Sequence, residues 1–134
     1  MYEDCKGRVI DKDLLDGLSD RAKNSSDLWM DYKLYHAPED KCLVLLKAIE
    51  PGSTAITCNS PKTSETIICM RGKLVVECYD SSEGISKESV TLTPNGSVVA
   101  VNIPIGQWHK LFACESGTII MEMVNGPYEK TDKE

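Results

Sequence analysis

The chain has 134 residues, enough for one domain with a sizeable core, and 41% of them are hydrophobic. Its formal net charge is −6 and it holds no cluster of Lys and Arg, so binding to nucleic acid or to an anionic membrane is not expected. No apolar run approaches the length of about eighteen residues that a membrane span needs, and the acidic N-terminus lacks the apolar stretch of a signal peptide, so we expect a cytoplasmic protein.

Six cysteines are scattered along the sequence. None of them forms a Cys-x-x-Cys pair, and several lie in apolar, strand-like segments, where a free cysteine packs as a small hydrophobic residue. Because a reducing compartment is expected, we predict free thiols and no disulfide framework.

Residues 1–40 are expected to form a helix followed by an aromatic brace. Residues 8–24 place leucine and alanine at helical spacing, and Asp11 is the expected N-cap. This helix is expected to pack on a sheet and to take no part in catalysis. The segment 27–40 contains three aromatic residues and turns just after His36.

Residues 41–134 read as a barrel domain of short β-strands. Turn-forming residues recur at intervals of roughly ten residues and separate β-branched, apolar segments, which indicates a sandwich or barrel. The links at 71–73 and 116–117 are each expected to join two paired strands. Strands are expected at 42–49, 54–57, 65–70, 74–79, 86–92, 98–103, 108–114 and 118–124.

Two stretches carry regular motif spacing. In the first, Gly52 is followed by five residues, then Cys58-Asn-Ser60, four residues, Glu65, six residues and Gly72. In the second, residues 104–109 read Pro-Ile-Gly-Gln-Trp-His.

These spacings resemble the two motifs of the cupin superfamily. The first cupin motif has Gly, His-x-His, Glu and Gly at these intervals, and the second has Pro-x-Gly, two residues, His, three residues and Asn. Here Glu65 and His109 match, whereas Cys58 and Ser60 replace the two histidines and Ala113 replaces the Asn.

The chain as a whole is similar to the small WbuC-type cupins, in its leading helix, in the segment ending at His36, in residues 103–109 and in the tail that begins Gly126-Pro-Tyr. The resemblance implies an all-β cupin double-stranded β-helix, or jelly-roll barrel, with a short N-terminal α-helix. It also implies a metalloprotein that binds or acts on a sugar-like small molecule in surface polysaccharide biosynthesis.

Strand alternation predicts that Glu65 and His109 share the inner face of the barrel, which leaves three functions open. Cys58, Glu65 and His109 could hold a divalent metal, Zn²⁺ by ligand type, with an open fourth position. Glu65 and His109 could instead be the catalytic acid/base pair of a metal-free isomerase or epimerase. The site could also be a non-catalytic ligand-binding or structural remnant without metal.

Further expectations concern the pocket and the assembly. Ser60, His36 and Tyr79 are expected to line the substrate pocket. The apolar run Cys42–Leu46 is expected to lie at an open sheet edge and to pair with a second copy, which predicts a homodimer.

Overall fold

The computed structural model describes residues 7–53, 56–58, 63–79 and 86–125. These ranges form one helix and nine strands, so the prediction of an all-β fold with one short N-terminal helix is confirmed. The elements are α1 Lys12–Lys23, β1 Trp29–Lys33, β2 Cys42–Ile49, β3 Ile56–Cys58, β4 Glu65–Arg71, β5 Leu74–Tyr79, β6 Ser86–Leu92, β7 Ala100–Ile103, β8 Trp108–Ala113 and β9 Thr118–Asn125.

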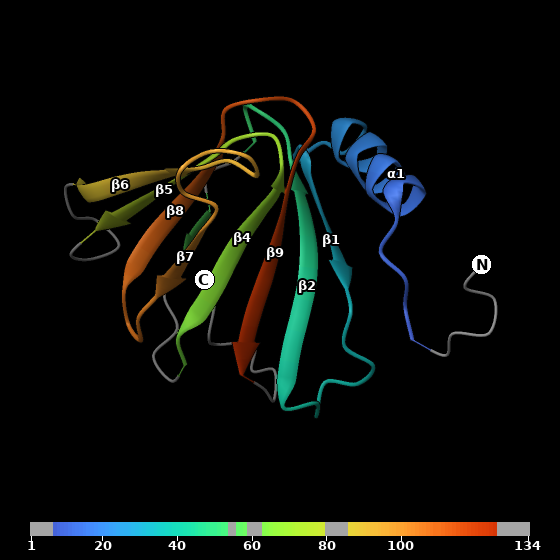
Figure 1. Ribbon diagram of the computed structural model, residues 1–134, viewed down its shortest axis with the longest axis horizontal. Helices are drawn as coiled ribbons and strands as arrows, with labels where there is room; N and C mark the ends of the chain where they lie inside the picture. Colours follow the sequence, from blue (N-terminus) through green and yellow to red (C-terminus); the bar gives the residue numbers. More distant parts are fainter. Residues whose placement is uncertain (1–6, 54–55, 59–62, 80–85, 126–134) are drawn as a thin grey trace.

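The strands form two antiparallel sheets packed face to face (Figure 1). One sheet has the order β1-β2-β9-β4-β7 and the other has the order β3-β8-β5-β6. Both contribute inward-facing apolar side chains to one core, because alternate residues of each strand point to the same face. The core residues are Ile49, Ile67, Cys69, Leu74, Val76, Leu92, Ile103, Leu111 and Ile120.

The two expected strand pairs are wrong, because both links cross between the sheets. β4 pairs with β7 and β9, whereas β5 pairs with β6 and β8. Likewise β8 lies in the four-stranded sheet and β9 in the five-stranded sheet. A short link that contains Gly is compatible with a hairpin and with a turn between two sheets. The sequence of the link therefore does not show whether the two flanking strands pair with each other.

Gly72, in the link between β4 and β5, is required by both its backbone and its surroundings. Its φ is +79°, a conformation that L residues with a side chain rarely adopt. A Cβ at this position would lie 2.4 Å from Thr118 Oγ1 and 2.8 Å from Thr118 Cα. The glycine therefore allows the cross-sheet link to touch the start of β9.

Helix α1 packs on the outer face of the five-stranded sheet, as expected of a brace (Figure 1). It begins at residue 12 because the Asp11 carboxylate accepts a hydrogen bond from the Leu14 N–H at 2.9 Å, which confirms the predicted N-cap. Leu18 and Ala22 are fully buried against that face. No helix in the described part of the chain is long and apolar enough to cross a membrane.

The aromatic segment contributes a strand, β1, which lies at the edge of the five-stranded sheet. The sheet therefore starts at residue 29, ahead of the expected barrel boundary at residue 41. β2 pairs with β9 along its whole length and with β1 over residues 45–49, so the expectation that the whole of Cys42–Leu46 lies at an open edge is wrong. The homodimer itself stays a prediction.

The thiols agree with the sequence-based expectation where the structure describes them. Cys42, Cys69 and Cys114 are free thiols. Burial raises the pKa of the Cys69 thiol, which favours its neutral form in the core.

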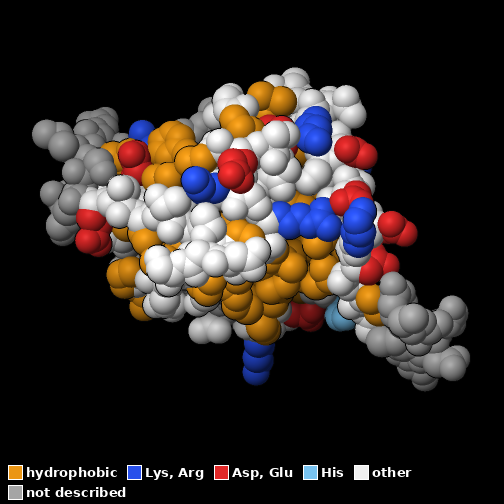
Figure 2. All heavy atoms as spheres, turned by 45° about the horizontal axis from the view of Figure 1, so that its top comes forward, with side chains coloured by type: hydrophobic (Ala, Val, Ile, Leu, Met, Phe, Trp, Pro, Cys, Tyr) orange, Lys and Arg blue, Asp and Glu red, His pale blue; other side chains and the backbone are white. Residues whose placement is uncertain are grey.

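A charge network ties α1 to the sheet. Asp16 Oδ2 lies 2.6 Å from Lys12 Nζ, and its Oδ1 lies 2.7 Å from Arg71 Nη1 at the end of β4. The hydrogen bond from Lys12, and to a smaller extent the one from Arg71, lowers the pKa of Asp16. Figure 2 shows charges of both signs interspersed over the surface around α1.

Gly72→Ala is expected to destabilise the protein more than Gly117→Ala. Both glycines have a positive φ, +79° and +83°, but a Cβ on Gly117 meets nothing within 4 Å. Gly117→Ala should therefore cost only the backbone strain, about 1–2 kcal/mol, while the contact with Thr118 should add about 1–3 kcal/mol in Gly72→Ala. Urea unfolding of both variants measures the difference, and equal losses would contradict the close contact.

Asp16→Asn is expected to change how the free energy of unfolding depends on pH in the acidic range. Because the folded pKa of Asp16 lies below its unfolded value, its contribution is present above the ordinary pKa of about 3.9 and is lost as the pH falls through the folded pKa. The stability gap between wild type and Asp16→Asn should therefore close on acidification. Thermal unfolding from pH 6 to pH 2 tests this, with Asp20→Asn on the same helix as control; a gap that widens in acid would refute the assignment.

Candidate functional site

Glu65 and His109 meet in the interior between the two sheets. Glu65 opens β4 and His109 follows Trp108 at the start of β8, and they are 3% and 2% exposed. The alternation that buries Ile67 and Leu111 also turns these two side chains inward. His109 Nε2 lies 2.9 Å from Glu65 Oε1, which confirms that the two groups share one inner face and contact each other.

The hydrogen bonds of His109 determine how many protons the pair holds. Nδ1 lies 3.0 Å from the carbonyl oxygen of Gln107, and a carbonyl only accepts, so Nδ1 carries a proton. The bond between Nε2 and Oε1 needs one further proton, on either atom. The pair is therefore imidazolium with carboxylate, or imidazole with carboxylic acid. Its net charge is zero in both forms, which lowers the cost of its burial.

Gln107 fixes the position of His109. Its side-chain amide donates to the carbonyl oxygens of Tyr79 and Trp108, at 2.7 and 3.0 Å, and so ties the end of β5 to the start of β8. Its backbone N–H donates to the Pro104 carbonyl oxygen at 3.2 Å. The turn of the second motif thus directs the Gln107 carbonyl at Nδ1 and leaves Nε2 facing Glu65.

Cys58 and Ser60 are described only in part or not at all. In the backbone register Cys58 of β3 lies opposite His109 of β8. Its side chain lies outside the described part of the structure, as does the whole of Ser60. Their predicted roles, as metal ligand and pocket residue, therefore stay predictions.

The described residues do not by themselves fit a metal centre. Bonds of about 2.0–2.2 Å to Zn²⁺ would set two tetrahedral ligands roughly 3.4 Å apart, whereas Nε2 and Oε1 lie at the hydrogen-bond distance of 2.9 Å. In residues 7–53, 63–79 and 88–125 no group of three or more His, Cys, Asp or Glu side chains could hold a metal ion. The three-ligand hypothesis thus depends on Cys58.

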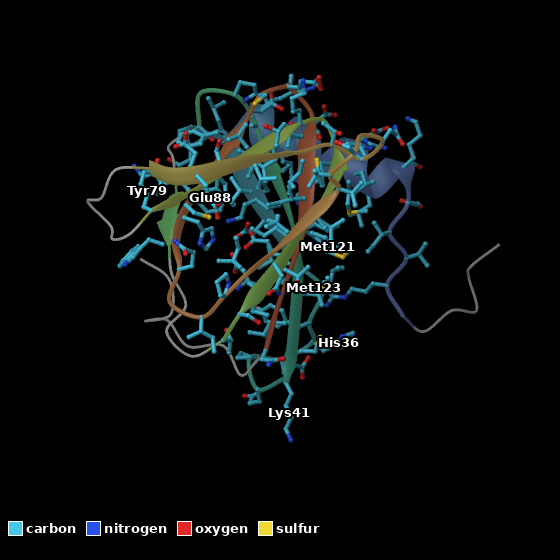
Figure 3. All side chains as sticks on the ribbon, turned by 60° about the vertical axis from the view of Figure 1, so that its left-hand side comes forward. His36, Lys41, Tyr79, Glu88, Met121 and Met123 are labelled. Carbon is cyan, nitrogen blue, oxygen red and sulfur yellow. The ribbon has the colours of Figure 1, made fainter. Side chains whose placement is uncertain are left out.

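The other two predicted pocket residues take no part in the contact between Glu65 and His109. His36 is exposed in the turn after β1, where its backbone N–H donates to Asp40 Oδ2 at 2.8 Å. Figure 3 shows His36 and Tyr79 well apart on the molecule. The structure therefore does not gather them into one pocket.

Tyr79 lies on the outer face of the four-stranded sheet. It is opposite Trp108 in the register, its hydroxyl donates to Glu77, and the Lys110 ammonium lies 5.0 Å from its ring centroid. The hydrogen bond to Glu77, with some burial, raises the pKa of Tyr79. Its neighbours are thus surface charges and not the Glu65–His109 pair.

Sequence reasoning missed three charged residues inside the barrel. Lys47 of β2 and Glu122 of β9 are buried, and Asp31 of β1 lies beside them. The sequence does contain a sign of them: Lys47 interrupts an otherwise apolar run, and it is two residues from the core residue Ile49, so both point to the same face of the strand. An ionisable residue at an inward position of a strand is unusual enough to mark a site.

The two paired sheets are similar to those of several solved structures, which define the fold class of this protein. KdgF from Halomonas sp. is similar at 14% identity and TM-score 0.59, covering 77% of this chain and 82% of KdgF. BH2720 from Bacillus halodurans is similar at 16% identity and TM-score 0.63, covering 95% and 86%. CapF from Staphylococcus aureus, a capsular polysaccharide assembling protein, is similar at 14% identity and TM-score 0.61, covering 77% and 28%. These likenesses show a cupin fold.

Within that class the family is also defined. The chain belongs to the family described as a domain of unknown function, DUF6016, whose model matches residues 10–91, more than half of the 134 residues. No curated protein matches the chain. The chain spans 28% of the length of CapF, so most of CapF has no counterpart here.

The proton on His109 Nδ1 is expected to persist at neutral pH. Imidazole ¹⁵N–¹H correlation spectra should show a protonated Nδ1 in wild type and in Glu65→Gln, because the Gln107 carbonyl is unchanged. In Glu65→Gln, Nε2 should become a bare acceptor for the new amide. The chain has two histidines, so His36→Gln assigns the signals. A His109 with a bare Nδ1 in wild type would contradict this reading.

Proposed function

We propose that this chain is a WbuC-type cupin that binds a sugar-like small molecule inside the barrel and acts on it as a metal-free acid/base isomerase or epimerase. The observation that carries the proposal is the contact of 2.9 Å between His109 Nε2 and Glu65 Oε1. A carboxyl group and an imidazole that share one proton are suited to take one proton from a substrate while giving another to it.

The chemistry follows from the proton count. In the imidazolium and carboxylate form, Glu65 takes the proton from a carbon next to a carbonyl group, and His109 gives its Nε2 proton to the carbonyl oxygen. The substrate becomes an enediol, while Glu65 becomes the acid and His109 the neutral base. Glu65 then returns a proton to the neighbouring carbon, or a proton is added to the opposite face of the same carbon, while His109 Nε2 takes an O–H proton from the enediol as the carbonyl group forms. This yields the isomer or epimer, and the imidazolium and carboxylate form is restored once Glu65 has lost its proton.

This reaction requires the substrate to lie between the two groups. Glu65 and His109 are almost fully buried and bonded to each other. A ligand must therefore open this end of the barrel and replace their direct hydrogen bond. The Gln107 carbonyl keeps the Nδ1 proton in place meanwhile, so that Nε2 stays the reacting nitrogen.

Support for a sugar-like ligand comes from the WbuC resemblance and from the likeness to CapF, which is named for capsular polysaccharide assembly. We propose a role in surface polysaccharide biosynthesis on that basis. The loss of both first-motif histidines, to Cys58 and Ser60, favours chemistry without metal, because serine is a poor metal ligand.

Solvent deuterium should enter the substrate only when the pair is intact. Free and nucleotide-linked sugars would be incubated with the protein in D₂O and followed by ¹H NMR. Glu65→Gln and His109→Gln should each slow the exchange by about 10²–10⁴-fold, the usual contribution of a general acid or base. Lys23→Ala, on the exposed side of α1, is the control.

Two outcomes would decide against this function. Binding of a sugar by wild type without any exchange would leave a non-catalytic ligand-binding cupin. Exchange that chelator abolishes and Zn²⁺ restores would favour the Cys58, Glu65 and His109 metal site. In that case Cys58→Ser should abolish the restoration by Zn²⁺.

A further inference from the structure

Lys47 is the one buried lysine or arginine among the side chains that the structure describes. Its Nζ lies 3.5 Å from Asp31 Oδ1, 3.6 Å from Glu122 Oε1 and 4.8 Å from the centroid of the Trp29 ring. Three strands, β1, β2 and β9, bring these residues together. We refer to Asp31, Lys47 and Glu122 as the Lys47 cluster.

The Lys47 cluster faces the same interior as the Glu65–His109 pair. In the register of β4 and β9, Glu65 lies opposite Val124 and Ile67 lies opposite Glu122. Glu65 and Glu122 are therefore diagonal neighbours on one face, with Cα atoms about 7–8 Å apart. Asp31, Lys47, Glu122 and Glu65 thus form one row across the inner face of the five-stranded sheet, and His109 of the other sheet contacts its Glu65 end.

Stability alone does not explain this row. Burial of a charged pair or triad costs more desolvation energy than an apolar replacement of similar volume, and such replacements are often neutral or stabilising. The neighbouring inward positions, Ile49, Ile67 and Ile120, are apolar and well packed. A charged cluster among them departs from the rule that inward-facing positions of a core strand are apolar, and such departures are typical of functional sites.

We propose that the Lys47 cluster is the part of the ligand site that recognises hydroxyl groups of a neutral sugar; this inference rests on the proposed function. The ammonium has three donors and each carboxylate has about four acceptor positions, which suits adjacent hydroxyls. The ammonium contacts are longer than the 2.7–2.9 Å of tight charge-assisted bonds. One ammonium beside two carboxylates disfavours an anionic group, so a neutral sugar is the ligand class.

The test replaces the whole cluster by apolar residues, Asp31→Val, Lys47→Met and Glu122→Leu together. Binding of D-glucose and D-glucuronate would be measured by ligand-observed NMR, and stability by thermal unfolding. We expect unchanged or higher stability, and binding of D-glucose weakened about tenfold or more. Wild type should bind D-glucose more tightly than D-glucuronate. The control is Lys110→Met, which removes the ammonium over Tyr79 on the outer face.

Each outcome decides for or against the proposal. A folded triple variant that binds D-glucose like wild type would show a structural cluster and overturn it. Tighter binding of D-glucuronate by wild type would overturn the neutral ligand class. If the triple variant does not fold, Lys47→Arg keeps the charge and moves the donors; unchanged affinity would contradict the proposal and weaker affinity would support it. Failure of wild type to bind any sugar would instead reject the proposed function, and this inference with it.

Discussion

The hydrogen bond between His109 Nε2 and Glu65 Oε1 is the contact on which the interior of this barrel depends. It joins β8 of one sheet to β4 of the other, at 2.9 Å, beside the core residues Ile67 and Leu111 of the same strands. Neither group could be buried alone without a large desolvation cost. Because each group hydrogen-bonds the other and the Gln107 carbonyl accepts from the second imidazole nitrogen, two ionisable groups can be buried in the core.

This arrangement divides the interior into two regions. Leu74, Val76 and Leu92 of the four-stranded sheet fill one region by close packing against the other sheet. The ionisable row fills the other, where Lys47 lies between Asp31 and Glu122. The apolar region accounts for stability, whereas the polar region is where ligand chemistry is possible.

Much of this could be read from the sequence, because local rules govern it. Strand alternation turns Glu65 and His109 inward, and Asp11 caps the helix through its own side chain. The two cross-sheet links could not be foreseen, since turn residues at Gly72 do not reveal which strands pair. Lys47 and Glu122 were missed for a related reason: their strands come together only through long-range pairing of β2 with β9.

A double-mutant cycle on Glu65 and His109 tests the mutual dependence of the pair most directly. Glu65→Met and His109→Phe would each leave one buried polar partner, so each should cost about 3–5 kcal/mol of unfolding free energy. The double variant removes both polar groups and should be no less stable than the better single variant. The cycle is measured by urea unfolding of the four proteins. Losses that add within about 0.5 kcal/mol would contradict a shared, buried hydrogen bond.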